Sequence, residues 1–196
     1  MDLERIAHSE LPTRFGDFTV HAFRCEGGLE HVALVAGEPG LGALVRVHSE
    51  CATGDIFGSL RCDCGDQLAA ALDAISAAGS GLLIYLRGHE GRGIGLVNKI
   101  RAYALQDRGL DTIEANHQLG FPADAREYGA AIAILREFGL SEIRLLTNNP
   151  DKIAALEEAG IKVVERVPLW TAPNPHNSRY LETKRAAMGH IPPGRR

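Results

Sequence analysis

The sequence predicts an α/β fold, a mixed sheet flanked by helices, with a β-rich N-terminal segment. Two patterns indicate this class. Apolar and polar residues alternate along much of the first 47 residues, as in half-buried strands. From about residue 65, amphipathic helical patterns alternate with short apolar runs, as in βαβ units. The chain of 196 residues suits one large domain or two small ones, and we expect a single domain over residues 1–190, followed by a disordered tail over residues 191–196.

The N-terminal segment carries three predicted strands, residues 16–23, 31–36 and 44–48. A turn rich in glycine and proline, residues 37–40, separates the second strand from the third. The third strand runs directly into a loop that holds three of the four cysteines.

The later elements follow from helical and strand patterns and from glycines that end the helices. In chain order they are helix 66–78, strand 82–86, a glycine-rich loop 87–95, helix 96–108, an irregular stretch 112–122, helix 124–138, strand 142–146, helix 151–159 and strand 161–166. We expect helix 96–108 to carry Leu96, Ile100 and either Tyr103 or Ala104 on one face. Residues 167–196 are expected to be irregular or partly helical.

The cysteine loop is the strongest chemical signal. Cys51 is followed by ten residues and then by Cys62 and Cys64. Thiolates are good Zn²⁺ ligands, and three of them leave one tetrahedral corner open for water. Two other interpretations remain at this point: three buried apolar thiols, or a closed site with His48 as the fourth ligand. Cys62 and Cys64 stand at a predicted helix start, which favours the thiolate form.

Composition excludes several classes of protein. The net charge of −4 argues against non-specific nucleic-acid binding. No apolar run approaches the roughly 20 residues that span a membrane. Cysteines are few and no segment resembles a secretory signal, so we expect reduced thiols and a cytoplasmic location. Cys25 is interpreted as a thiol without a role.

The glycine-rich loop 87–95 follows a strand and precedes a helix, which is where phosphates bind. Arg87 and Arg92 in the loop, and Lys99 and Arg101 after it, supply positive charge. The loop is not a P-loop, so that class of NTPase is excluded. The alternative is a tight turn with solvated arginines.

Two other stretches could face an anion. Residues 147–152 combine a strand end, a hydroxyl, a lysine and a helix start with Asn149 as N-cap, although an ordinary capped helix explains the same pattern. Asp124 and Arg126 could place a carboxylate beside a guanidinium that faces an anion. The sequence alone favours a capping box between Asp124 and Glu127.

Together, these stretches resemble the GTP cyclohydrolase II family. The resemblance extends from about Val20 to His190 and is carried by RVHSECATGDIFGSLRCDCGDQL, LRGHEGRGIGLVNKIRAYALQD, DTIEANHQLGFPADAREYG, RLLTNNPDK and NPHNSRYLETKRAAMGH. It implies a homodimeric zinc enzyme that opens the guanine imidazole ring of Mg²⁺-bound GTP in riboflavin biosynthesis. It would release formate and pyrophosphate and form 2,5-diamino-6-(5-phosphoribosylamino)pyrimidin-4(3H)-one. A fused dihydroxybutanone-phosphate synthase domain would need roughly 200 further residues, so we expect the monofunctional form.

The resemblance also implies roles for individual residues. Cys51, Cys62 and Cys64 match the zinc ligands. The positions that match GTP contacts are Arg46, Val47, His48, Ser49, Glu50, Gln67, Glu90, Gly91, Arg92, Thr112, Thr147 and Lys152. Asp124 matches a proposed proton acceptor, Arg126 a proposed nucleophile at the α-phosphate, and Tyr103 a tyrosine associated with completing ring opening. Electrostatic support of the leaving pyrophosphate would explain Arg126 equally well.

Alternative functions follow from the same motifs. Many family members read RQEGRGIGL where this chain reads RGHEGRGIGL, and some relatives retain the formyl group; Tyr103 favours the full reaction. A regulator that binds GTP without turnover would keep the same pocket. A zinc-stabilised nucleic-acid module is disfavoured by the net charge of −4.

Overall fold

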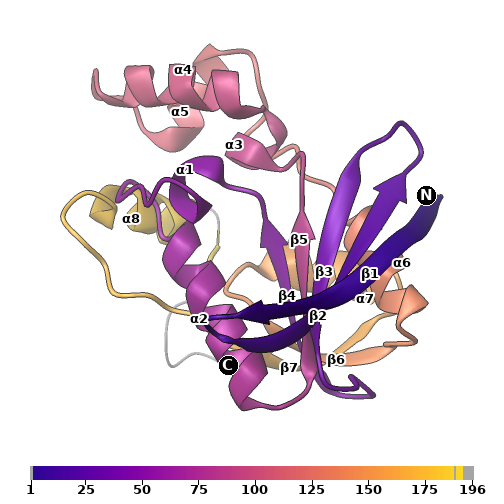
Figure 1. Cartoon of the computed structure of the whole chain (residues 1–196). Coiled ribbons are helices and arrows are strands. Elements are labelled where there is room, and N and C mark those ends of the chain that lie inside the picture. Colours follow the sequence, from indigo (N-terminus) through magenta and orange to yellow (C-terminus); the bar gives the residue numbers. More distant parts are fainter. Residues whose placement is uncertain (1, 188, 192–196) are drawn as a thin grey trace.

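The computed structural model describes residues 2–187 and 189–191. Its centre is a seven-stranded sheet in the order β1-β2-β3-β5-β4-β6-β7 (Figure 1). The strands are β1 (Leu3–Thr13), β2 (Gly16–Cys25), β3 (Glu30–Ala36), β4 (Ala43–Ser49), β5 (Gly81–Leu86), β6 (Glu142–Leu146) and β7 (Lys162–Val167). The predicted mixed sheet is therefore confirmed.

Strands β1, β2 and β3 form an antiparallel meander, and β3 pairs antiparallel with β5. The sequence pattern missed β1 because its side chains are almost all exposed, so no apolar alternation marks it. It nevertheless pairs with β2 from Leu3 opposite Cys25 to Thr13 opposite Gly16.

Strands β5, β4, β6 and β7 are parallel neighbours. Their carboxyl ends consequently meet at one edge of the sheet, the usual place for a ligand in an open α/β fold. The predicted loops that follow residues 48, 86 and 146 all leave from this edge.

Helices cover both faces of the sheet. Ala71, Leu72 and Ile75 of α2 pack in one apolar core, and Ile134, Leu135 and Leu156 of α6 and α7 pack in the other. The helices are α1 (Ala52–Asp55), α2 (Cys64–Ala77), α3 (Glu90–Gly93), α4 (Leu96–Gln106), α5 (Thr112–Gln118), α6 (Gly129–Glu137), α7 (Pro150–Glu158) and α8 (Ser178–Ala187).

Two local predictions were wrong. Residues 112–118 form α5, whose start is stabilised by a capping box between Asp111 and Glu114. The helix predicted from residue 124 begins at Gly129, so the capping box proposed for Asp124 does not form. Helices α4 and α5 project beyond the sheet (Figure 1).

In α4 the buried residues are Lys99 and Ala102, whereas Leu96 and Ile100 are exposed. The apolar pattern thus indicated the helix but not its inward face. The expectation of partial helix in the C-terminal stretch is confirmed by α8. Of the predicted disordered tail, only Ile191 lies within the described residues, and its N–H donates to the Asn148 carbonyl at 3.0 Å.

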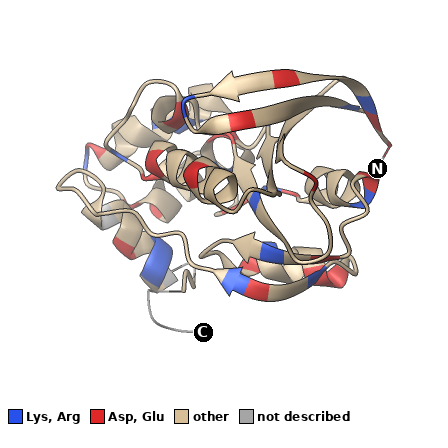
Figure 2. Cartoon of the chain, turned by 60° about the horizontal axis from the view of Figure 1, so that its bottom comes forward, with Lys and Arg blue, Asp and Glu red and all other residues tan. Residues whose placement is uncertain are grey.

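Within residues 2–187 and 189–191, no helix is both long and apolar enough to cross a membrane. Figure 2 shows acidic and basic residues interspersed along strands and helices in that view.

Candidate active site and metal centre

A cleft of ≈ 1090 Å³, including its open mouth, lies at the carboxyl edge of the parallel strands. It brings together most of the site residues implied by the sequence. Those that line it are Arg46, His48, Ser49, Glu50, Cys51, Cys62, Cys64, Gln67, Gly91, Arg92, Tyr103, Thr112, Arg126, Thr147 and Lys152. Val47, Glu90 and Asp124 stand behind this wall and contact residues that line it.

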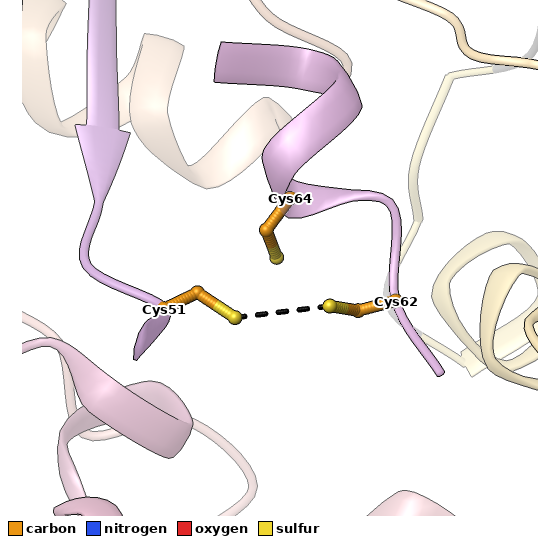
Figure 3. Close-up of side chains that lie close together, drawn as sticks. All are labelled: Cys51, Cys62 and Cys64. Atoms are coloured by element: carbon orange, nitrogen blue, oxygen red, sulfur yellow. Dashed lines mark hydrogen bonds between the residues drawn. The ribbon is translucent and has the colours of Figure 1, made fainter. Parts of the chain in front are cut away.

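The three cysteines converge on one point at the base of the cleft. Cys51 follows β4, Cys62 lies in the loop before α2, and Cys64 is the first residue of α2. Their side chains point toward one another (Figure 3). All three sulfur atoms lie within 4.8 Å of one another, and Cys51 Sγ is 3.7 Å from Cys62 Sγ. A disulfide would need about 2.05 Å, whereas sulfurs around a tetrahedral Zn²⁺ lie about 3.8 Å apart. The donor set therefore fits zinc.

Gly54 shows how closely the chain wraps this cluster. A Cβ at Gly54 would lie 2.8 Å from Cys62 Sγ and 3.2 Å from Cys51 Sγ. The backbone therefore approaches the sulfurs in a way that only glycine allows. Three scattered apolar thiols would not require such a cradle.

His48 is not a fourth ligand in this arrangement. Among the described residues the cluster of potential ligands contains only the three cysteines. The His48 Nε2 atom lies 3.1 Å from both carboxylate oxygens of Asp55, and Asp55 also accepts from Tyr85 Oη at 2.8 Å. Burial lowers the pKa of His48, so its ring is neutral near pH 7. A metal held by the three cysteines would therefore keep one coordination position free of described protein ligands.

Two buried cations face the cleft from the strand ends. Arg46 donates to the Leu146 carbonyl at 2.8 Å and to Gln67 Oε1 at 2.7 Å, while its Nε has no partner among the described residues. Burial lowers the Arg46 pKa to about 10. Lys152 Nζ donates to the Val47 carbonyl at 2.8 Å and forms no ion pair with a described carboxylate. Burial and the neighbouring Arg46 lower the Lys152 pKa, because they disfavour the charged ammonium. A bound anion would favour the charged form again.

Asp124 and Arg126 form a forked ion pair at the cleft wall, where Arg126 lines the cleft and Asp124 lies behind it. Arg126 Nε lies 2.9 Å and 3.1 Å from the two Asp124 oxygens, and Nη2 also donates to the carboxylate. Burial opposes ionisation of both groups, but their mutual pairing outweighs it, so the Asp124 pKa is lowered and the Arg126 pKa is raised. Both are therefore charged near pH 7, and Arg126 Nη1 reaches Ser49 Oγ at 3.4 Å.

The glycine-rich loop is strained at Arg92. This residue has φ of 67°, between Gly91 and Gly93, which also have positive φ. A left-handed conformation at a residue with a Cβ costs about 1 kcal/mol or more, and such strain is concentrated at functional sites. The buried Arg92 Nη2 has no partner among the described residues, so a polar group remains available to an anion.

Sequence reasoning missed several residues that line the cleft, namely Arg61, Asn116, Asn148, Tyr180, Lys184 and His190, and it gave Lys99 a different role. Lys99 was expected to attract phosphate together with Arg101. Instead Lys99 turns toward Cys51, with Nζ 3.0 Å from its sulfur, and Arg101 is exposed. Lys184 comes from α8, and no local pattern indicated that this helix returns to the cleft.

The fold and the site thus define a class: an α/β protein with a three-cysteine group that could bind a metal, in a cleft lined by cationic side chains. The family model for GTP cyclohydrolase II matches residues 4–168. The chain belongs to the GTP cyclohydrolase II family.

Relatives along the whole chain agree with this assignment. The chain is 58% identical over 194 residues to "GTP cyclohydrolase-2" of Azotobacter vinelandii, covering 97% of this chain and 93% of the relative. It is 56% identical over 197 residues to the protein of the same name from Cronobacter sakazakii, covering 97% and 98%. A rice relative, "Probable bifunctional riboflavin biosynthesis protein RIBA 2, chloroplastic", is 56% identical over 192 residues, which cover 96% of this chain but 35% of that protein.

Proposed function

We propose that this protein hydrolyses GTP to 2,5-diamino-6-(5-phosphoribosylamino)pyrimidin-4(3H)-one, formate and pyrophosphate, the first step of riboflavin biosynthesis. One water opens the imidazole ring at C8, a second releases formate from the resulting formamide, and a third cleaves the bond between the α- and β-phosphates. Membership of the GTP cyclohydrolase II family supports this reaction.

The observation that carries the proposal is the joint placement of two kinds of site in one cleft. The three-cysteine cluster suits a metal that activates water, and Arg46, Lys152 and Arg126 suit a triphosphate. Lys152 in particular is a buried cation that an anionic ligand would neutralise. A cleft for a neutral substrate would not need it.

The cofactors follow from these two parts. Cys51, Cys62 and Cys64 would hold one Zn²⁺, which supplies Lewis acidity and makes a water molecule more acidic. Mg²⁺ would enter with the triphosphate and offset its charge. The chain's residues then orient GTP: Thr112, Gln67 and Thr147 line the cleft beside the cations.

Asp124 and Arg126 act as a pair in this proposal. The lowered Asp124 pKa keeps the carboxylate ionised and able to accept a proton, although it makes the group a weak base. The raised Arg126 pKa favours a charged guanidinium that supports the leaving pyrophosphate over a neutral nucleophile.

Tyr103 takes part in the ring-opening steps in this proposal, and its position at the cleft wall supports that role. Its hydroxyl lies 3.4 Å from Thr53 Oγ1, and the Arg61 guanidinium lies 4.3 Å from its ring centre. These contacts hold the ring at the cleft wall beside the cysteine cluster.

A homodimer in a reducing, cytoplasmic compartment completes the proposal. The metal-binding role requires reduced thiols. Support for a dimer comes from the resemblance and from exposed apolar side chains just after α1 and on α4, including Phe57 at 74% and Val97 at 68% exposure. Light scattering should give twice the chain mass. If Val97 lies in the dimer interface, Val97→Asp should lower the measured mass toward that of one chain.

Product analysis tests the reaction. Purified, zinc-loaded protein is incubated with GTP and Mg²⁺, the nucleotide product is identified by mass spectrometry, and formate and pyrophosphate are quantified. Equal amounts of both, with the diaminopyrimidinone product, are expected. A product that retains the formyl group would show that the reaction stops after ring opening. The products of Tyr103→Phe would then be compared with those of the unchanged protein. GTP binding without turnover would overturn the enzymatic proposal.

A further inference from the structure

A buried ion pair stands directly behind the cysteine cluster. Lys99 Nζ lies 2.6 Å from Glu90 Oε1, and the two side chains are 10% and 7% exposed. The same ammonium donates to Cys51 Sγ at 3.0 Å and to Thr53 Oγ1 at 2.8 Å. The pair therefore connects α3 and α4 to one of the three sulfurs.

The contacts of Lys99 exclude a role as a phosphate ligand. An ammonium carries three N–H donors, and Cys51, Thr53 and Glu90 use all three. None is left for a substrate oxygen. Lys99 therefore differs from Lys152, which donates to a single carbonyl in these contacts.

Glu90 is occupied in the same way. Its Oε1 accepts from Lys99, and its Oε2 accepts from the Ala52 N–H at 2.6 Å. Glu90 thus holds both the lysine and the backbone next to Cys51. The resemblance implied that Glu90 contacts GTP, but both of its oxygens point to the chain.

The charge on the metal site explains why such a pair is useful. Three thiolates and one Zn²⁺ carry a net charge of −1, and strong electron donation from sulfur weakens the Lewis acidity of the metal. A charged hydrogen-bond donor on the sulfur withdraws part of that donation. Glu90 keeps the donor in place, because an unrestrained ammonium in the cleft would turn toward the triphosphate.

We propose that Lys99 and Glu90 are positioning residues for the metal-binding thiolate: Lys99 reduces electron donation from Cys51 to the metal, and Glu90 fixes Lys99 and Ala52 around that sulfur. This inference rests on the proposed function, because it requires the cysteine cluster to bind a metal. It assigns Glu90 to the metal site and away from GTP.

Cobalt(II) substitution tests the inference without turnover, because thiolate-to-cobalt charge-transfer bands report electron donation from sulfur. The test variant combines Lys99→Met with Glu90→Gln, which removes both charges and leaves an acceptor for the Ala52 N–H. Replacing a buried ion pair by uncharged residues of similar volume is often close to neutral for folding. The matched control is Lys162→Met with Glu142→Gln, an exposed pair at 3.0 Å on β6 and β7.

The expected result is a shift of the charge-transfer band to longer wavelength in the test variant, with one cobalt bound per chain and no shift in the control. In the zinc enzyme, kcat should fall about 10- to 100-fold. Lys99→Arg, which keeps a charged donor, should show a smaller shift than the test variant.

An unchanged band in a test variant that binds one cobalt per chain would overturn the inference. A test variant that folds but no longer binds cobalt would support the positioning role, because the pair is then needed to hold Cys51. If the unchanged protein itself binds no cobalt or zinc, the metal part of the proposed function fails and this inference fails with it.

Discussion

Lys184 Nζ donates to Asp63 Oδ1 at 2.7 Å, and both side chains are largely buried. Asp63 stands between Cys62 and Cys64, whereas Lys184 lies on α8 near the C-terminus. This contact ties the C-terminal helix to the turn that presents two sulfurs. The segment after α8 is also held, because the Ile191 N–H donates to the Asn148 carbonyl.

We predict that Asp63→Asn loosens α8. The change leaves the Lys184 ammonium buried without its carboxylate, which typically costs about 3–5 kcal/mol. Local opening of α8 exposes the unpaired ammonium to water, so amide exchange in Ser178–Ala187 should accelerate in hydrogen–deuterium exchange. Trypsin should also cleave sooner after Lys184.

The control for this variant is Glu182→Gln on the same helix. Glu182 pairs with Arg185 at 2.6 Å, but both side chains are more than half exposed, so little change is expected. Equal exchange rates in the two variants would show that the Asp63 contact does not hold α8.

A second prediction concerns Lys152, whose pKa is lowered by burial and by Arg46. Lys152→Met removes a desolvated charge that has no described carboxylate partner, so the free energy of unfolding should stay within about 1 kcal/mol or rise. GTP affinity should fall about 10- to 100-fold, because a charged hydrogen bond contributes about 1.5–3 kcal/mol.

Guanidinium unfolding and nucleotide titration calorimetry measure both quantities for Lys152→Met. Lys162→Met, at an exposed position, is the control for loss of a positive charge. A large loss of stability with unchanged GTP affinity would mean that Lys152 is structural.

Most of the cleft-lining residues could be named from the sequence, the cysteines from their spacing and the others from the family resemblance. The cysteines lie in one short loop, and the ends of β4 and β6 carry their polar residues directly after apolar strands. The parallel order of these strands then brings the ends together. Asn149 shows the same principle, since its side chain accepts from the Asp151 N–H as an N-cap should.

Two features could not be predicted from the sequence, because they depend on contacts between residues far apart in the chain. The buried face of α4 contains Lys99, which bonds to Cys51 and Glu90. The apolar side chains of Leu96 and Ile100 are exposed instead. Likewise, Lys184 reaches Asp63 across 121 positions, and no local periodicity records such a distance. Polar contacts at the site thus decide two features that hydrophobic patterns left open.

A third prediction concerns pH. Burial, together with the neighbouring Arg126, lowers the pKa of His89 to about 4 from the ordinary value of 6.5. Between these two values the unfolded chain binds a proton that the folded chain does not, so the free energy of unfolding should fall as the pH drops below about 6.5. The contribution is at most about 1.4 kcal/mol per pH unit.

His89→Gln removes this contribution, and Gln can still bond to Ser49, whose Oγ lies 3.1 Å from His89 Nδ1. Denaturant unfolding between about pH 7 and about pH 5 should therefore show a shallower pH dependence in the variant. Exposed His176→Gln should leave the slope unchanged. Parallel slopes for all three proteins would contradict a lowered His89 pKa.

The last prediction distinguishes two roles for Arg126. Its fork with Asp124 raises the Arg126 pKa and keeps the guanidinium charged, which makes it a poor nucleophile. After denaturation during turnover, intact-protein mass spectrometry should show no guanylyl adduct. Arg126→Lys should lower kcat about 100- to 1,000-fold, because a lysine keeps the charge but cannot reproduce the fork.

Arg101→Lys, an exposed change on α4, should leave kcat unchanged and serves as the control. A guanylyl adduct on Arg126 would establish covalent catalysis and overturn the electrostatic role. Full activity in Arg126→Lys would mean that charge alone is sufficient and that the Asp124 fork serves only to order the loop before α6.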